Sequence, residues 1–134
     1  MNDAGIVNPP ALGRPSGFSH GILVPAGSRL LFVAGQTAAD ANGAIAAVDF
    51  VSQFELALAH TLLVVQEAGG TPAAVVRMTV FVTSIEAYRG ARAALADIWR
   101  THMGSSYPAM SVIGVAALVP RDACVEIEAT AVVP

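Results

Sequence analysis

The stretch from Cys124 to Thr130 constrains the fold of this chain more than any other. Its side chains alternate between apolar and polar, in the order Val125, Glu126, Ile127, Glu128, Ala129 and Thr130. Successive side chains of a strand point to opposite faces of a sheet, so the pattern predicts a strand with one apolar and one carboxylate-bearing face. The chain must therefore build a sheet with one covered face and another that presents Glu126 and Glu128.

A second strand is predicted over residues 108–115, which are β-branched and bounded by Pro and Gly. The connection to the first strand contains Pro120 and Asp122, residue types that favour turns. The two strands are therefore expected to lie side by side, with Met110 and Ser111 beside the carboxylate face.

The remaining segments predict an α+β domain that spans residues 1–134. Residues 1–17 are rich in Pro and Gly and are interpreted as an irregular N-terminal arm. The predicted strands are 18–24 and 29–34, which form a hairpin, then a short strand at 44–47, and 75–82. Helices are predicted over 50–68, after an Asp49 N-cap, and over 85–102. Both helices are expected to cover one face of a single sheet.

The composition suggests that the other sheet face also needs cover. Hydrophobic residues make up 54% of the chain and charged residues only 13%. A domain of 134 residues buries a modest fraction of its surface, so this is a surplus of apolar area. Two interpretations stay open, an obligate subunit interface and a simple bias toward Ala and Val.

Several classes of protein are not favoured by the sequence. No apolar run reaches the ~18 residues of a membrane span, and no signal peptide is recognised, so a cytoplasmic protein is expected. The net charge is −3 and the seven cations are scattered arginines, which does not favour nucleic-acid binding. Without lysine the chain cannot form a lysine Schiff base.

Glu126 is the best single candidate for chemistry. A carboxylate in apolar surroundings tends to have a raised pKa and can act as an acid or base. The alternative is that Glu126 and Glu128 lie on a solvated strand face. No zinc motif surrounds His20, His60 or His102.

The lone Cys124 is interpreted as a small buried thiol, because an activated nucleophile would need a nearby base or cation. No metal and no cofactor are expected.

The chain resembles the YjgF/Rid (reactive intermediate deaminase, endoribonuclease L-PSP-like) family over nearly its whole length. The resemblance is carried by an ordered set of short motifs: Ser16-Gly17-Phe18-Ser19-His20-Gly21, Phe32-Val33-Ala34-Gly35-Gln36, Glu67-Ala68-Gly69-Gly70, Thr79-Val80-Phe81-Val82, Tyr107-Pro108-Ala109 and Val125-Glu126-Ile127-Glu128-Ala129. It implies a chorismate-mutase-like fold and a homotrimer with a central barrel. It also implies ligand clefts between subunits and cofactor-free hydrolysis of enamines and imines to a keto acid and ammonia.

The same resemblance implies specific site residues. The family has an Arg that grips the substrate carboxylate where this chain has Met110. It commonly has a Tyr, a Ser and a Cys at the positions of Phe18, Ala34 and Val112. These differences make the predicted cleft more apolar.

Two implied site residues are retained. Glu126 corresponds to the Glu that can position the hydrolytic water, and Gly35 to a residue whose backbone lines the cleft. Ser111, beside Met110, completes the predicted ligand-binding set. Arg14, in the N-terminal arm, is a candidate to replace the missing cation.

Three functions remain open at this point. One is an enamine or imine hydrolase with changed specificity, and another is a non-catalytic trimer that binds a small apolar metabolite. A ribonuclease or translation inhibitor is suggested by family labels alone, and the acidic balance of the chain argues against it.

Overall fold

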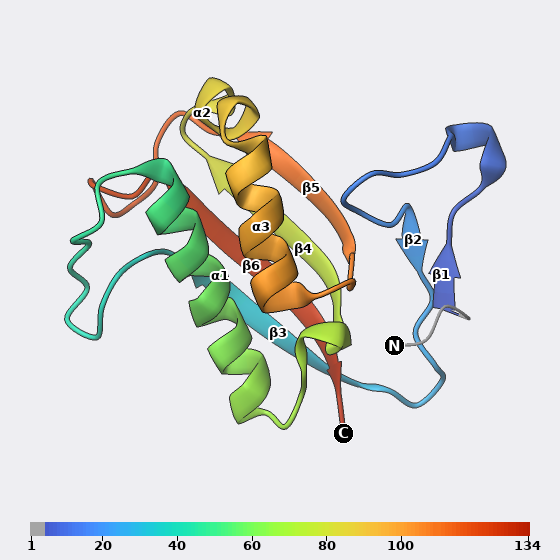
Figure 1. The fold of residues 1–134 in the computed structure, drawn as a ribbon. Coiled ribbons are helices and arrows are strands. Elements are labelled where there is room, and N and C mark those ends of the chain that lie inside the picture. The colour runs from blue at the N-terminus through green and yellow to red at the C-terminus, as the bar shows by residue number, and fades with distance from the viewer. Residues whose placement is uncertain (1–4) are drawn as a thin grey trace.

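A computed structural model describes residues 5–134 and shows a four-stranded sheet whose one face is covered by helices (Figure 1). The strands, in chain order, are β3 (Arg29–Gln36), β4 (Val75–Val82), β5 (Ala109–Gly114) and β6 (Val125–Val133). They are arranged in space as β3-β6-β4-β5. The mixed α+β class predicted from the sequence is confirmed.

Helix α1 (Phe50–Glu67) matches the prediction closely. The Asp49 side chain caps it by accepting a hydrogen bond from Ser52 N at 2.9 Å. That bond lowers the pKa of Asp49, because the hydrogen bond favours the charged form. The apolar stripe, which includes Phe54, Leu58 and Val65, is buried against the sheet. A short 3₁₀ turn, η3 (Pro72–Ala74), then leads into β4.

The second predicted helix is divided in two. α2 (Ile85–Gly90) is capped by Ser84, whose hydroxyl accepts from Ala87 N at 3.1 Å, and α3 (Arg92–Met103) follows after Ala91. Gly90 is a poor residue for a helix interior, which favours an interruption here. Because of this break, the start of α3 is a helix N-terminus rather than a helix middle.

The predicted hairpin between β5 and β6 is wrong. β4 lies between them, parallel to β5 and antiparallel to β6. The connection through residues 115–124 is too long for a tight hairpin, and it passes the end of β4, where Val115 N donates to Val82 O at 2.8 Å. The helical crossover from β4 to β5 makes those two strands parallel neighbours.

The N-terminal region also differs from the prediction. The arm contains β1 (Ile6–Val7) and a 3₁₀ turn, η2 (Pro10–Leu12), and β1 pairs with β2 (Gly21–Ile22). The predicted hairpin of 18–24 with 29–34 is therefore wrong, because β1 takes the hydrogen bonds of β2 while β3 pairs with β6. Residues 44–47 form no strand.

The two sheet faces differ as the alternation in β6 predicts. Val125, Ile127 and Ala129 are buried under the helices, whereas Glu126 is half-buried and Glu128 exposed on the other face. No element of the described chain covers that second face, and large apolar side chains are exposed there, with Phe32 at 75% and Leu30 at 48%. We call this surface the open face.

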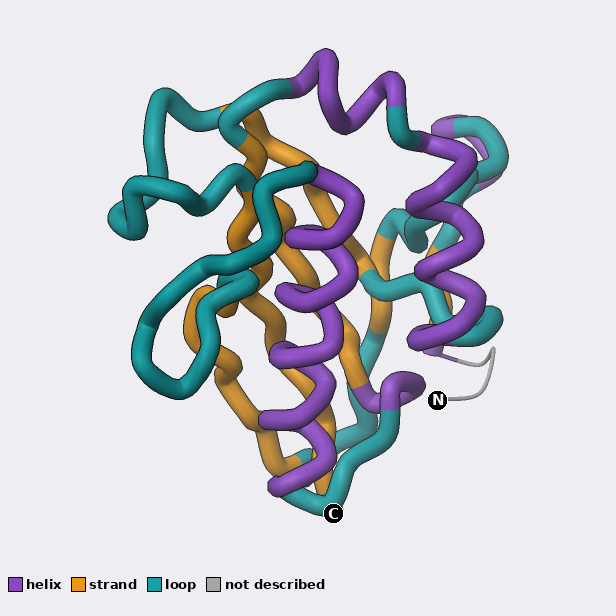
Figure 2. The backbone as a smooth tube through the Cα atoms, turned by 60° about the vertical axis from the view of Figure 1, so that its left-hand side comes forward, coloured by secondary structure: helices purple, strands orange, loops and turns teal. Residues whose placement is uncertain are grey.

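The loops that join β3 to α1 and β5 to β6 run next to each other on one side of the molecule (Figure 2). Buried Gln53 on α1 holds them there. Its side-chain amide donates to Ala47 O and Asp122 O, both at 2.9 Å, and its carbonyl accepts from Cys124 N at 2.9 Å. None of the helices among residues 5–134 combines the length and apolarity needed to cross a membrane.

Candidate functional site

A cavity of about 830 Å³ lies between helices α2 and α3 and strands β4 and β5. Most of its lining is aromatic or aliphatic. The lining residues that matter below are Phe18, Tyr88, Arg92, Trp99, Tyr107 and Met110. The volume falls within the ~300–1,000 Å³ typical of small-molecule pockets.

Phe18 reaches this cavity because the segment around it is attached to the start of β5. Ser19 N donates to Pro108 O at 3.0 Å, and the Ser19 hydroxyl donates to Tyr107 O at 2.6 Å. Ser19 and Ala109 also form an isolated parallel bridge. The chain therefore places Phe18 on the wall that also contains Met110.

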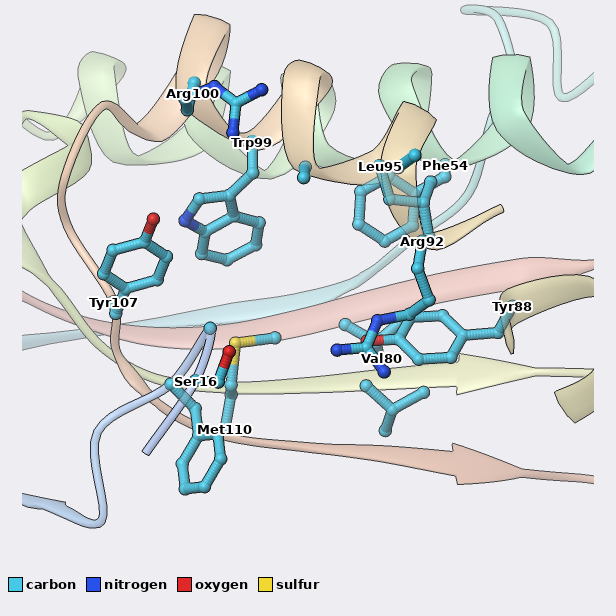
Figure 3. Close-up of a pocket in the computed structure, with 15 residues that line it drawn as sticks. Ser16, Phe54, Val80, Tyr88, Arg92, Leu95, Trp99, Arg100, Tyr107 and Met110 are labelled. Atoms are coloured by element: carbon cyan, nitrogen blue, oxygen red, sulfur yellow. The ribbon is translucent and has the colours of Figure 1, made fainter. Parts of the chain in front are cut away.

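One end of the cavity is aromatic. The rings of Trp99 and Tyr107 are stacked, with centroids 6.1 Å apart and planes inclined by 10°. The indole is fixed by a hydrogen bond from Nε1 to Ser106 O at 3.0 Å. Figure 3 shows these two rings at one end and Tyr88 with Arg92 at the other, with Met110 between them.

Arg92, like Tyr88 and Trp99, lines the cavity but was missed by sequence reasoning. Its guanidinium lies over the Tyr88 ring, 5.7 Å from the centroid, within the range of a cation–π contact. Arg14, the predicted substitute cation, is not in the cavity lining. The four-residue spacing of Tyr88 and Arg92 indicates that the two side chains lie on the same side of a helix. Only the packing of the helices shows that this side lines the cavity beside β5.

Glu126 lies on the opposite side of the sheet. It is aligned with Phe81 of β4, which is in turn aligned with Ile113 of β5, so all three belong to the open face. Its carboxylate packs against the backbone of Gly35, where a Cβ atom would lie only 2.6 Å from Glu126 Oε2. Gly35 and Ala34 lie at a break in the pairing of β3 with β6, between Val33 and Gln36.

The predicted site residues are therefore divided between two places. Phe18, Met110 and Val112 line the cavity on the helix side of the sheet. Glu126, Gly35 and Ser111 lie on the other side, since Ser111 is aligned with Thr79, the partner of Glu128. One chain by itself does not bring the two groups together.

The remaining candidates have local structural roles. His60 Nδ1 lies 2.8 Å from Thr37 O, and His102 Nε2 lies 3.4 Å from Glu55 Oε1. The ring of His20 meets that of Phe18 edge-on at 5.1 Å. Burial raises the pKa of the Cys124 thiol, which disfavours the reactive thiolate. Within residues 5–134, no three His, Cys, Asp or Glu side chains form a group that could hold a metal ion.

Comparison with known proteins gives a consistent result. Residues 11–133 match the family model described as Endoribonuclease L-PSP. A RutC family protein of Pasteurella multocida is 31% identical over 103 residues, which are 77% of this chain and 79% of that protein.

Two solved structures are also similar. A Yersinia pestis protein of the conserved Rid family, of unknown function, has a TM-score of 0.81 and 37% identity, over 96% of this chain and 97% of its own. Escherichia coli TdcF, crystallised with bound serine, has a TM-score of 0.68 and 31% identity, over 91% and 92% of the two chains.

Proposed function

Since this chain belongs to the YjgF/Rid family, we propose that it is a small-molecule hydrolase acting on enamine- or imine-type substrates with an apolar body. The observation that carries the proposal is the cavity beside Met110, which has the size of a metabolite site and an aromatic lining. The serine bound to TdcF supports a role in small-molecule binding for this fold.

We place the reactive site between copies of the chain. Glu126 and the cavity lie on opposite faces of one sheet, so only a neighbouring copy can bring a carboxylate to the cavity mouth. The open face presents Phe32, Leu30 and Ile113 to solvent, and covering it would bury this apolar area. A homotrimer in which three such faces line a central barrel would cover this apolar area.

The proposed reaction needs no cofactor. Glu126 accepts a hydrogen bond from a water molecule and takes its proton as the water oxygen bonds to the imine carbon. The C=N electron pair moves to the nitrogen, which is protonated. The resulting amino alcohol then loses ammonia as the C–N bond breaks and a carbonyl forms. An enamine enters the same route after it takes up a proton at carbon and loses one from nitrogen to become the imine.

Ammonia release from a panel of enamines and imines tests this function. We expect turnover of at least one member with an apolar side chain, and a loss of about 10²- to 10⁴-fold in Glu126→Gln, as for removal of a general base. Glu128→Gln is the matched control, because Glu128 lies two residues away on the same face and is exposed. Absence of turnover, or equal effects of the two substitutions, would contradict the proposal.

A non-catalytic binding protein is the second candidate. It is favoured by the uncharged Met110 at the position where the family resemblance implies an Arg. In that case at least one member of a metabolite library would bind and raise the unfolding temperature of the protein, while no member would be turned over. A ribonuclease is not proposed, since the chain has a net charge of −3 and scattered cations.

A further inference from the structure

We propose that Arg92 is the residue that binds the ligand's anionic group, and that the ligand is a carboxylate with a flat aromatic body. The inference rests on the proposed function in one respect, namely that the cavity beside Met110 is the ligand site. It assigns anion binding to the start of helix α3, whereas the family resemblance implies an anion-binding Arg on β5, at the position of Met110.

The charge distribution of the cavity supports this assignment. Its lining contains two arginines, Arg92 and Arg100, and no Asp or Glu among the residues that the structure describes. The chain as a whole carries a net charge of −3, so the positive charge of the cavity lining is opposite in sign to that of the whole chain. A site with cations and no carboxylate favours an anionic ligand.

Of the two arginines, Arg92 is the one available to a ligand. Arg100 is paired with Asp97 on the same helix. No ion pair within residues 5–134 includes Arg92. Its guanidinium is held over Tyr88 at 5.7 Å, which limits its conformational freedom and leaves its N–H donors for a second partner.

The start of α3 adds to the preference for an anion. Arg92 is the first residue of the helix, Ala91 provides no side-chain cap, and no acidic residue lies in the first turn. A helix N-terminus carries partial positive charge and is normally occupied by acidic or capping side chains. Arg92 and Ala93, the first two residues of this helix, line the cavity, so its uncapped start lies beside the position proposed for the carboxylate.

The other end of the cavity indicates the rest of the ligand. Trp99 and Tyr107 are stacked there, and Met110 lies between them and Arg92 (Figure 3). Aromatic faces and a thioether both make favourable contacts with an aromatic ring. A ligand with its carboxylate at Arg92 and its ring over Met110 would extend from the charged end of the cavity toward the aromatic end. Within the proposed function, this indicates a 2-imino acid with an aromatic side chain.

The test uses the single tryptophan of the chain as a reporter. Because Trp99 lines the cavity, its fluorescence follows occupancy of this site in the assembled protein. Phenylacetate and phenylacetamide are titrated as a pair that differs in charge but hardly in shape. We expect the acid to bind about 10- to 100-fold more tightly than the amide, as a charge-assisted hydrogen bond provides.

Arg92→Gln is expected to bring the two affinities within about twofold of each other. Arg89→Gln is the matched control, since Arg89 lies three residues earlier, pairs with Glu86 and does not line the cavity. It should retain the preference for the acid. The inference is overturned if Arg92→Gln keeps that preference, if the wild-type protein does not distinguish the two compounds, or if neither compound changes the fluorescence.

This binding experiment is separable from the test of the hydrolase. Equilibrium binding requires no turnover, so preference for the acid can be lost in Arg92→Gln even if no ammonia is ever released. That outcome would support the role of Arg92 and contradict the hydrolase. The reverse outcome, turnover that depends on Glu126 with no role for Arg92 in binding, would support the hydrolase alone.

Discussion

Substitution of Gly35 by Ala is the sharpest test of how Glu126 is positioned. A Cβ atom on residue 35 would lie 2.6 Å from Glu126 Oε2 and 2.7 Å from its Cδ, whereas ordinary contacts begin at 3.4 Å. The carboxylate would therefore have to move by about 0.8 Å. The atoms that clash are at the end of a flexible side chain, so the backbone need not change and the loss of stability should stay within about 1 kcal/mol.

The displaced carboxylate should instead lower the rate of the reaction. A misplacement of about 1 Å can reduce a rate by about 10²-fold, so we expect kcat/KM for ammonia release to fall by about that factor in Gly35→Ala. The assay is steady-state ammonia release from a substrate that the wild-type protein turns over, with urea unfolding in parallel.

Gly21→Ala is the control for this prediction, because a Cβ atom there meets its nearest neighbours at an ordinary 3.6 Å. Gly21→Ala should change neither kcat/KM nor the free energy of unfolding. The reasoning is refuted if Gly35→Ala is as active as Gly21→Ala, or if it loses activity only because it unfolds.

The remaining predictions concern stability, assembly and specificity. Gln53→Leu should lower the free energy of unfolding by about 2–4 kcal/mol, because three part-buried hydrogen bonds to the backbone are lost, whereas exposed Gln66→Leu should have little effect in the same urea titration. Since the hydrogen bond at the N-cap lowers the pKa of Asp49, its contribution to stability is present above the unfolded value of 3.8 and is lost as the pH falls below it. The fall in stability on acidification should therefore be smaller in Asp49→Asn. Native mass spectrometry should give three times the 13.7-kDa chain mass, and Phe32→Glu should give monomers; a monomeric wild-type protein would contradict the assembly. Met110→Arg should increase hydrolysis of 2-iminopropionate by about tenfold or more, and no gain would show that a missing cation on this strand is not what limits small substrates.

Local sequence patterns predicted much of the secondary structure. The alternation in β6 predicts which side chains are buried, because the side-chain period of a strand depends only on the backbone. In the same way, the Asp49 cap and the apolar stripe predict α1, since both depend on residues within a few turns of each other. The break at Ala91 was missed because helical spacing continues across it and Gly90 alone is a weak signal.

The pairing of strands could not be read from the chain in this way. The predicted hairpins at 18–34 and 108–129 failed because each assumed that neighbours in sequence are neighbours in the sheet. In the structure β4 separates β5 from β6, and β3 pairs with β6 rather than with β2, through contacts between residues far apart in the chain. Such pairings depend on the summed packing of the helices and the sheet.

The sequence by itself determined the α+β class, the covered and open faces of β6, and the residues that resemble a Rid-family site. Only the tertiary structure decided that Met110 and Glu126 lie on opposite sides of the sheet and that Arg92 lines the cavity. The physical reason is that the face on which a side chain lies within one strand follows from the two-residue period of that strand. Which faces of different strands and helices meet depends on register and packing between them.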